Sequence, residues 1–377
     1  RTCPGQSASR DAACRDRQRA KGENRSLHSE TTLKETMFDM LRQCLCRSNF
    51  LKVCLTLCAW LAVPAMASTQ DVPPEQPLGT GPFPAVMESV PELPDHTVYR
   101  PANLHAPGLG RMPVVVWGNG ACVNVGNRFR WFLTELASHG FLVVAIGPIG
   151  PRLAESMEGV KYRGDPAPDS PAGRAGVRRV PNAAGGTPGE GLAETSPAQL
   201  AHGISWATEV NARAGSAFAG RIDPSRVAAM GQSCGGLQAL ALAADPRVTT
   251  LGIWNSGALS DEVMASRIAG APVSKRTLDA VRVPILYVTG DPSDVAYANA
   301  EDDFEKLEGR SVVRLWRERT PHAGTYRQPG GGAFSPVAVA WLKWQLKSDA
   351  EAAKLFKGRD CGLCAQPEWH LKKKGID

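Results

Sequence analysis

The feature that most constrains this chain is a regular alternation of short apolar runs and longer amphipathic segments between residues 95 and 348. Runs such as 114–117, Val-Val-Val-Trp, are continuously apolar, which is typical of strands that helices cover on both faces. Strands that take turns with helices form βαβ units with right-handed crossovers. We therefore expect an α/β fold: a doubly wound, mostly parallel sheet with helices on both faces, in a single domain.

The same patterns place the individual elements. The expected strands are 96–99, 113–117, 141–146, 227–230, 249–254, 284–289 and 311–316. The expected helices are 128–138, 199–214, 237–244, 296–307 and 337–347.

Charge excludes one class of function. Residues 1–67 hold 11 of the 43 Lys and Arg residues and 6 of the 37 Asp and Glu residues, so the remainder carries a net charge of only +1. A body this close to neutrality has no electrostatic attraction for nucleic acid or for an anionic membrane surface. We expect no nucleic-acid partner.

The N-terminal region is typical of an exported protein. Residues 1–36 form a polar leader, which we interpret as disordered or never translated. Residues 37–67 place basic residues before the apolar run 53–63 and end in Ala65-Met66-Ala67, the layout of a signal peptide cleaved after Ala67. An uncleaved anchor or a buried helix is the alternative. Cleavage predicts a secreted or periplasmic chain without stable membrane association.

Three segments depart from the alternation. Residues 68–94 are rich in Pro and Gly and predict an extended arm, and residues 349–377 form a tail with a cysteine pair. Residues 151–197 are dense in Gly, Pro, Ala and Arg and are longer than an ordinary connection. We interpret them as a surface insertion, with a lid over a site as the alternative.

The strongest chemical signal is a serine between two glycines. Gly231-Gln232-Ser233-Cys234-Gly235-Gly236 lies directly after an expected strand and directly before an expected helix. In this context Gly-x-Ser-x-Gly forms a sharp turn that presents a nucleophile at the carboxyl edge of the sheet. Ser233 is the predicted nucleophile.

A serine nucleophile needs a histidine base and an acid that orients the base. On a doubly wound sheet the order along the chain is serine, acid, histidine, which selects His322 among the seven histidines. Two acids follow the expected strand 284–289, Asp291 and Asp294, and their spacing alone does not decide between them.

The oxyanion of a tetrahedral intermediate needs backbone N–H donors. One is predicted at Cys234, the residue after the nucleophile. The second is predicted in the small-residue stretch after strand 113–117, at Asn119 or, failing that, at Gly120.

With these residues the chain resembles the secreted α/β-hydrolase superfamily, within it the cutinase-like and polyester hydrolases and the relatives of dienelactone hydrolase. The matching segments are 81–84 (Gly-Pro-Phe-Pro), 96–101 (His-Thr-Val-Tyr-Arg-Pro), the turn 231–236 and the turn 290–294. The resemblance implies that Asp294 is the triad acid, that Asn119 is the second oxyanion donor, and that Trp254 lines the acyl subsite. The other interpretation of Trp254 is a core aromatic. Polyester hydrolases usually carry an aromatic or Met at the positions of Asn119 and Cys234.

Four of the ten cysteines follow residue 67. In an α/β-hydrolase fold the strands before Cys122 and Cys234 are neighbours, so a disulfide between them is geometrically plausible, and buried free thiols are an equal alternative. Cys361 and Cys364 predict a local disulfide in the tail, and Lys372 to Lys374 a solvated end.

Together these features predict a serine carboxylester hydrolase for short-chain, aromatic or polyester-type esters. Its partner would be a small or polymeric ester, and we expect a monomer that uses neither metal nor organic cofactor. The alternatives are a serine peptidase, which usually brings a further large domain, and a non-catalytic binding protein on the same scaffold.

Overall fold

The computed structural model describes residues 79–150 and 193–377, and the described residues belong to one compact unit. The leader 1–36, the signal peptide 37–67 and residues 151–192 of the predicted insertion lie outside the described residues. Part of the predicted arm, residues 68–78, lies outside them as well.

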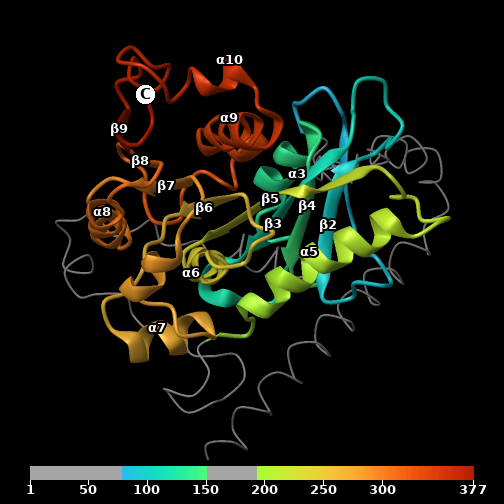
Figure 1. The fold of residues 1–377 in the computed structure, drawn as a ribbon, viewed down its shortest axis with the longest axis horizontal. Helices are drawn as coiled ribbons and strands as arrows, with labels where there is room; N and C mark the ends of the chain where they lie inside the picture. Colours follow the sequence, from blue (N-terminus) through green and yellow to red (C-terminus); the bar gives the residue numbers. More distant parts are fainter. Residues whose placement is uncertain (1–78, 151–192) are drawn as a thin grey trace, which may run out of the picture. The chain divides into compact units, whose positions relative to one another are not determined.

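A nine-stranded sheet organises the described residues (Figure 1). Its spatial order is β1-β2-β4-β3-β5-β6-β7-β8-β9, and the six strands from β4 to β8 run parallel. The strands are β1 (Ala85–Glu88), β2 (His96–Pro101), β3 (Met112–Gly118), β4 (Leu142–Ile146), β5 (Ile222–Gln232), β6 (Thr250–Trp254), β7 (Ile285–Gly290), β8 (Val312–Arg317) and β9 (Trp369–Lys374).

Helices connect the strands. The α-helices are α3 (Arg130–Ser138), α5 (Pro197–Ala212), α6 (Cys234–Ala241), α7 (Glu262–Ala269), α8 (Tyr297–Lys306), α9 (Phe334–Lys347) and α10 (Ala350–Ala353). The described residues also contain three short 3₁₀ helices: η1 (Gly120–Cys122), η2 (Lys275–Ala280) and η3 (Pro329–Gly331).

The sheet carries a hydrophobic core on each face because successive side chains of a strand point to opposite sides. In β3, which is buried throughout, Val114 and Val116 join the core under α5, α6 and α8, whereas Val115 and Trp117 join the core under α3 and α9. A strand buried on both sides needs apolar residues at every position, and this explains its continuous apolar run. The expected α/β architecture is confirmed at this level.

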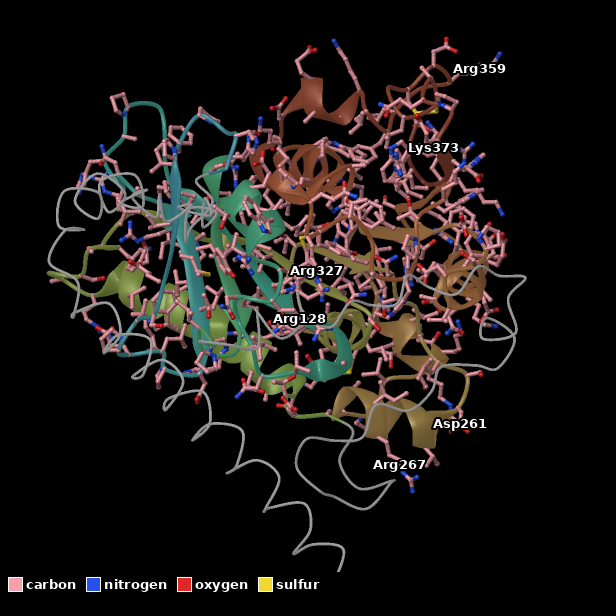
Figure 2. All side chains as sticks on the ribbon, turned by 180° about the vertical axis from the view of Figure 1, so that it is seen from behind. Arg128, Asp261, Arg267, Arg327, Arg359 and Lys373 are labelled. Carbon is pink, nitrogen blue, oxygen red and sulfur yellow. A yellow bond between two sulfur atoms is a disulfide. The ribbon has the colours of Figure 1, made fainter. Side chains whose placement is uncertain are left out.

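The sequence patterns located the inner strands to within a few residues but missed both edges. The predicted arm contains β1, which pairs antiparallel with β2. The predicted tail contains β9, which pairs antiparallel with β8, so Lys372 to Lys374 are strand residues rather than a solvated end. Lys373, which is labelled in Figure 2, donates from its Nζ atom to the carbonyl oxygen of Gly358 at 2.8 Å.

Among the described residues, no helix has the length and apolar character that crossing a membrane requires.

Candidate active site

The turn between β5 and α6 presents Ser233 at the carboxyl edge of the sheet. Ser233 has φ 53° and ψ −119°, a conformation that a non-glycine residue adopts only at a cost of about 1–3 kcal/mol. Its glycine neighbours are required sterically, since a Cβ on Gly231 would lie 2.2 Å from the carbonyl oxygen of Gly235. A Cβ on Gly235 would lie 2.0 Å from the carbonyl oxygen of Gly118 in β3. Because these glycines have no side chain, α6 can begin in direct contact with β3.

The structure brings three sequence-predicted side chains together at this edge. The Nε2 atom of His322 lies 2.9 Å from Oγ of Ser233, and its Nδ1 atom lies 2.6 Å from Oδ1 of Asp294. Ser233 follows β5, Asp294 follows β7 and His322 follows β8, so three separate strand ends supply the group. The side chain of His322 is 30% exposed, whereas that of Asp294 is fully buried.

The two candidate acids, Asp291 and Asp294, have different hydrogen-bond partners in the structure. Asp294 contacts His322, whereas Asp291 accepts hydrogen bonds from the backbone N–H and the hydroxyl of Ser293, at 2.9 and 2.6 Å. Asp291 therefore stabilises the turn before Asp294. Asp291 does not cap the following helix, because α8 begins at Tyr297 after Ala296 and no side chain caps it.

Four donors surround the carboxylate of Asp294. Oδ1 accepts from His322 and from the backbone N–H of Ala296 at 2.9 Å. Oδ2 accepts from Nδ2 of Asn255 at 2.7 Å and from the backbone N–H of Gly290 at 2.9 Å. Burial raises the pKa of Asp294, but the hydrogen bonds and charge of His322, with the bonds from Ala296 and Asn255, outweigh it and hold the pKa below its ordinary value. Asp294 is thus held ionised.

Sequence reasoning missed two side chains behind this carboxylate. Asn255 follows β6 and is fully buried, and its Oδ1 accepts from the hydroxyl of Tyr326 at 2.5 Å. A hydrogen-bonded chain therefore runs from Tyr326 through Asn255 and Asp294 to His322. The sequence contained one signal for Asn255: it is a polar residue directly after a buried strand, at the same edge of the sheet as Ser233.

Trp254 does not reach a substrate-facing surface. Its side chain is fully buried and packs in the core against Phe132 and Phe334, at ring-centroid distances of 5.3 and 5.8 Å. The expectation that Trp254 lines the acyl subsite is corrected by this placement, and the core-aromatic interpretation fits it.

The loop after β3 is folded by the side chain of Asn119. Its Nδ2 atom donates to the carbonyl oxygens of Val123, Val125 and Ile146, at 3.2, 3.0 and 2.7 Å. The amide nitrogen of Asn119 is therefore engaged within the loop, and its backbone N–H is the group that the sequence assigns to the oxyanion. The backbone nitrogen lies against α6, because a Cβ on Gly235 would come within 2.6 Å of it.

A disulfide joins this loop to the nucleophile turn. Cys122 and Cys234 are bonded, with their Cα atoms 5.2 Å apart, so of the two alternatives that the sequence left open the structure has the disulfide. Ala121 and Cys122 both have positive φ, 57° and 49°, so the loop turns through two strained residues. The carbonyl oxygen of Cys122 accepts from the hydroxyl of Thr195 at 3.0 Å, just before α5. The second expected disulfide, Cys361 to Cys364, is also present.

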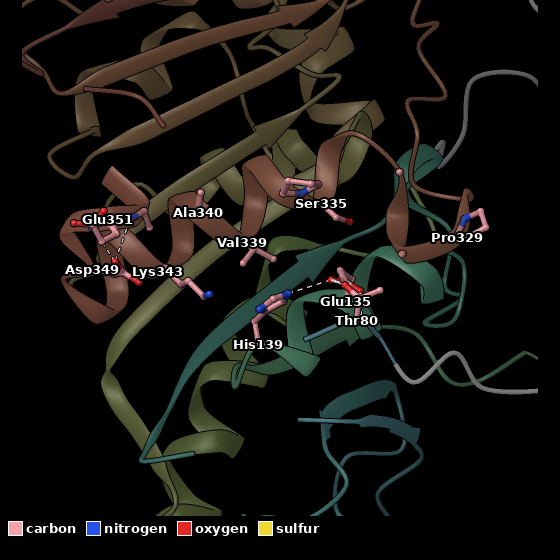
Figure 3. A pocket seen from close by; sticks show the side chains of 14 residues that line it. Thr80, Glu135, His139, Pro329, Ser335, Val339, Ala340, Lys343, Asp349 and Glu351 are labelled. Carbon is pink, nitrogen blue, oxygen red and sulfur yellow. Dashed lines mark hydrogen bonds and ion pairs between the residues drawn. The ribbon is translucent and has the colours of Figure 1, made fainter. Parts of the chain in front are cut away.

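A cavity of about 570 Å³ lies between α3 and the segment from η3 to α10, and its lining contains none of the triad side chains (Figure 3). On its wall the carboxylate of Glu135 accepts from the hydroxyl of Thr80 at 2.6 Å and lies 3.1 Å from Nε2 of His139. Within residues 79–150 and 193–377, no group of three or more His, Cys, Asp or Glu side chains is arranged to hold a metal ion.

No protein-family model matches this chain, and comparison with curated proteins yields no match either.

Proposed function

We propose that this chain is a serine carboxylic ester hydrolase with an α/β-hydrolase fold. The observation that carries the proposal is the continuous set of contacts from Ser233 through His322 to Asp294, supplied by three strand ends of a mostly parallel sheet. A serine hydroxyl gains nucleophilic character only beside a positioned base, and the base needs a charged partner that holds its tautomer. The ionised, buried Asp294 fits that second role.

The mechanism follows from these positions. Oγ of Ser233 attacks the acyl carbon while Nε2 of His322 takes the hydroxyl proton. Backbone N–H groups of Asn119 and Cys234 hold the oxyanion, and each such donor lowers the barrier by about 3 kcal/mol. His322 then gives its proton to the leaving alcohol, which departs and leaves an acyl-serine. Water, deprotonated by His322, attacks this ester, and collapse of the second intermediate releases the acid and returns the proton to Ser233.

The proposed substrates are short-chain, aromatic or polyester-type esters, encountered outside the cytoplasm after removal of residues 1–67. Two disulfides in the described residues support an oxidising compartment.

Substitution of the nucleophile tests the proposal. Ser233→Ala is expected to lower kcat for a p-nitrophenyl ester by about 10⁵ to 10⁶ while the unfolding midpoint stays near that of the wild type. A fluorophosphonate probe should label the wild type and leave this variant unlabelled. Ser293→Ala is a matched control, because Ser293 bonds only within the turn of Asp291.

Near-normal ester turnover by Ser233→Ala would refute the assignment. Absence of both labelling and turnover in the wild type would favour a non-catalytic binding protein. Cleavage of peptides in preference to esters would favour a peptidase.

A further inference from the structure

Gln232 occupies a junction that the ester-hydrolysis mechanism leaves without a role. It is the last residue of β5, immediately before Ser233, and only 5% of its surface is exposed. Its side chain lies against the loop after β3 and donates to the loop that carries His322. The side chain therefore lies between the proposed oxyanion donors and the proposed base.

One end of the Gln232 amide contacts the loop after β3. A Cβ placed on Gly120 would lie 1.9 Å from Oε1 of Gln232, so the amide oxygen fills the space that any side chain at position 120 would need. Cys234, on the other side of Ser233, is bonded to Cys122 of the same loop. Both chain neighbours of Ser233 thus hold the residues that follow Asn119.

The other end of the amide holds the histidine loop. The Nε2 atom of Gln232 donates to the main-chain carbonyl oxygen of His322 at 3.1 Å. The ring of His322 is fixed by Ser233 and Asp294, so this bond fixes the main chain from which the ring extends. Because an amide is planar and rigid, its two ends cannot shift independently.

We infer that Gln232 is a positioning residue that sets the spacing between the oxyanion loop and the imidazole of His322. The inference rests on the proposed function, because it assigns Gln232 a role in the same reaction. Its effect belongs to the transition state, where the oxyanion donors and the protonated imidazole must act together, and it should lower kcat rather than weaken substrate binding.

Two single substitutions separate the contributions of the amide. Gln232→Met keeps the length of the side chain and removes the hydrogen bond, and we expect kcat for p-nitrophenyl acetate to fall about 10-fold with KM changed by less than about threefold. Gln232→Glu replaces the donor with a carboxylate beside the loop of His322. An ionised carboxylate cannot donate to the carbonyl oxygen of His322, so kcat should fall at least as far as in Gln232→Met while KM changes by less than about threefold.

A double-mutant cycle tests the contact with Gly120. Gly120→Ala should lower kcat more than about 30-fold, because the new methyl group collides with Oε1 of Gln232. In the background of Gln232→Ala the same Gly120→Ala change should cost less than about threefold, because the colliding atom is absent. The backbone N–H of residue 120 is retained in every variant.

The control is Gln366→Met, which removes an exposed glutamine whose Nε2 donates to the carbonyl oxygen of Gly362 at 3.2 Å. It should leave kcat and KM unchanged. Equal losses from Gly120→Ala in both backgrounds, or a kcat of Gln232→Met equal to that of the wild type, would overturn the inference. These results would leave the proposed function standing, since that depends on probe labelling and turnover by the wild type.

Discussion

At the scale of single residues, the site depends on keeping one buried carboxylate charged. Asp294 has no exposed side-chain surface, and burial alone favours its neutral form. Its donors come from His322, Asn255 and two backbone N–H groups, so each oxygen accepts two hydrogen bonds. Tyr326 in turn fixes the amide of Asn255. The orientation of the Asp294 carboxylate is therefore determined by hydrogen bonds to both of its oxygens.

The two aspartates of the turn provide a matched pair of variants. Asp294→Asn should lower kcat by about 10⁴-fold, because the amide cannot stabilise the imidazolium or hold its tautomer. Asp291→Asn should change kcat by less than about threefold, since Asp291 only accepts bonds from Ser293. Steady-state ester hydrolysis with both purified variants measures the difference. A larger loss for Asp291→Asn would reverse the assignment of the triad acid.

At the scale of elements, the nucleophile turn and the loop after β3 are held together as one structural unit. They lie 112 residues apart in the chain between Cys122 and Cys234, and the disulfide joins them. Ser233, Ala121 and Cys122 all have positive φ, and strain of this kind persists only where surrounding contacts fix the backbone. The disulfide and the Gly118 to Gly235 contact provide that constraint.

Removal of this disulfide should affect activity and stability together. For Cys122→Ala/Cys234→Ala we expect a loss of about 3–5 kcal/mol in the free energy of unfolding, because the bridge closes a long loop. We also expect kcat to fall at least 10-fold as the strained loop relaxes. Cys361→Ala/Cys364→Ala is the control, since this bridge spans only three positions and lies outside the site. Urea unfolding and ester hydrolysis measure both effects, and unchanged kcat in the first variant would contradict the argument.

The same elements show why sequence reasoning succeeded in some places and failed in others. β3 and β7 were predictable because strands buried on both faces must be apolar throughout. β9 was missed because the sequence of an edge strand with one polar face resembles that of a lysine-rich tail. Ser233 and His322 follow from the order of elements along the chain, whereas the choice of Asp294 over Asp291 came from the family resemblance. The roles of Asn255 and Tyr326 do not follow from this order, because they depend on distances between strand ends.

At the scale of the compact unit, a polar contact closes the margin of the core that lies under α3 and α9. Lys347, the last residue of α9, reaches the end of α3, where its Nζ atom donates to the carbonyl oxygen of His139 at 2.9 Å. The ammonium also lies 4.4 Å from the ring centroid of Phe141, just before β4. Burial lowers the pKa of Lys347, and repulsion from the charge of Lys343 lowers it further. Attraction to Asp349 opposes these effects only in part, and the resulting pKa is about 8.

This lowered pKa makes the stability of the fold depend on pH in a defined window. The folded state releases the proton of Lys347 near pH 8, whereas the unfolded chain keeps it to about pH 10.5. The charged form is thus disfavoured by folding, and stability should rise with pH across this interval. Relative to Lys347→Met, the wild type should gain about 2 kcal/mol in the free energy of unfolding between pH 7 and about 9.5. Urea denaturation of both proteins at the two pH values measures this difference. Other titrating groups cancel in the comparison, so a difference independent of pH would show that Lys347 has an ordinary pKa in the folded protein.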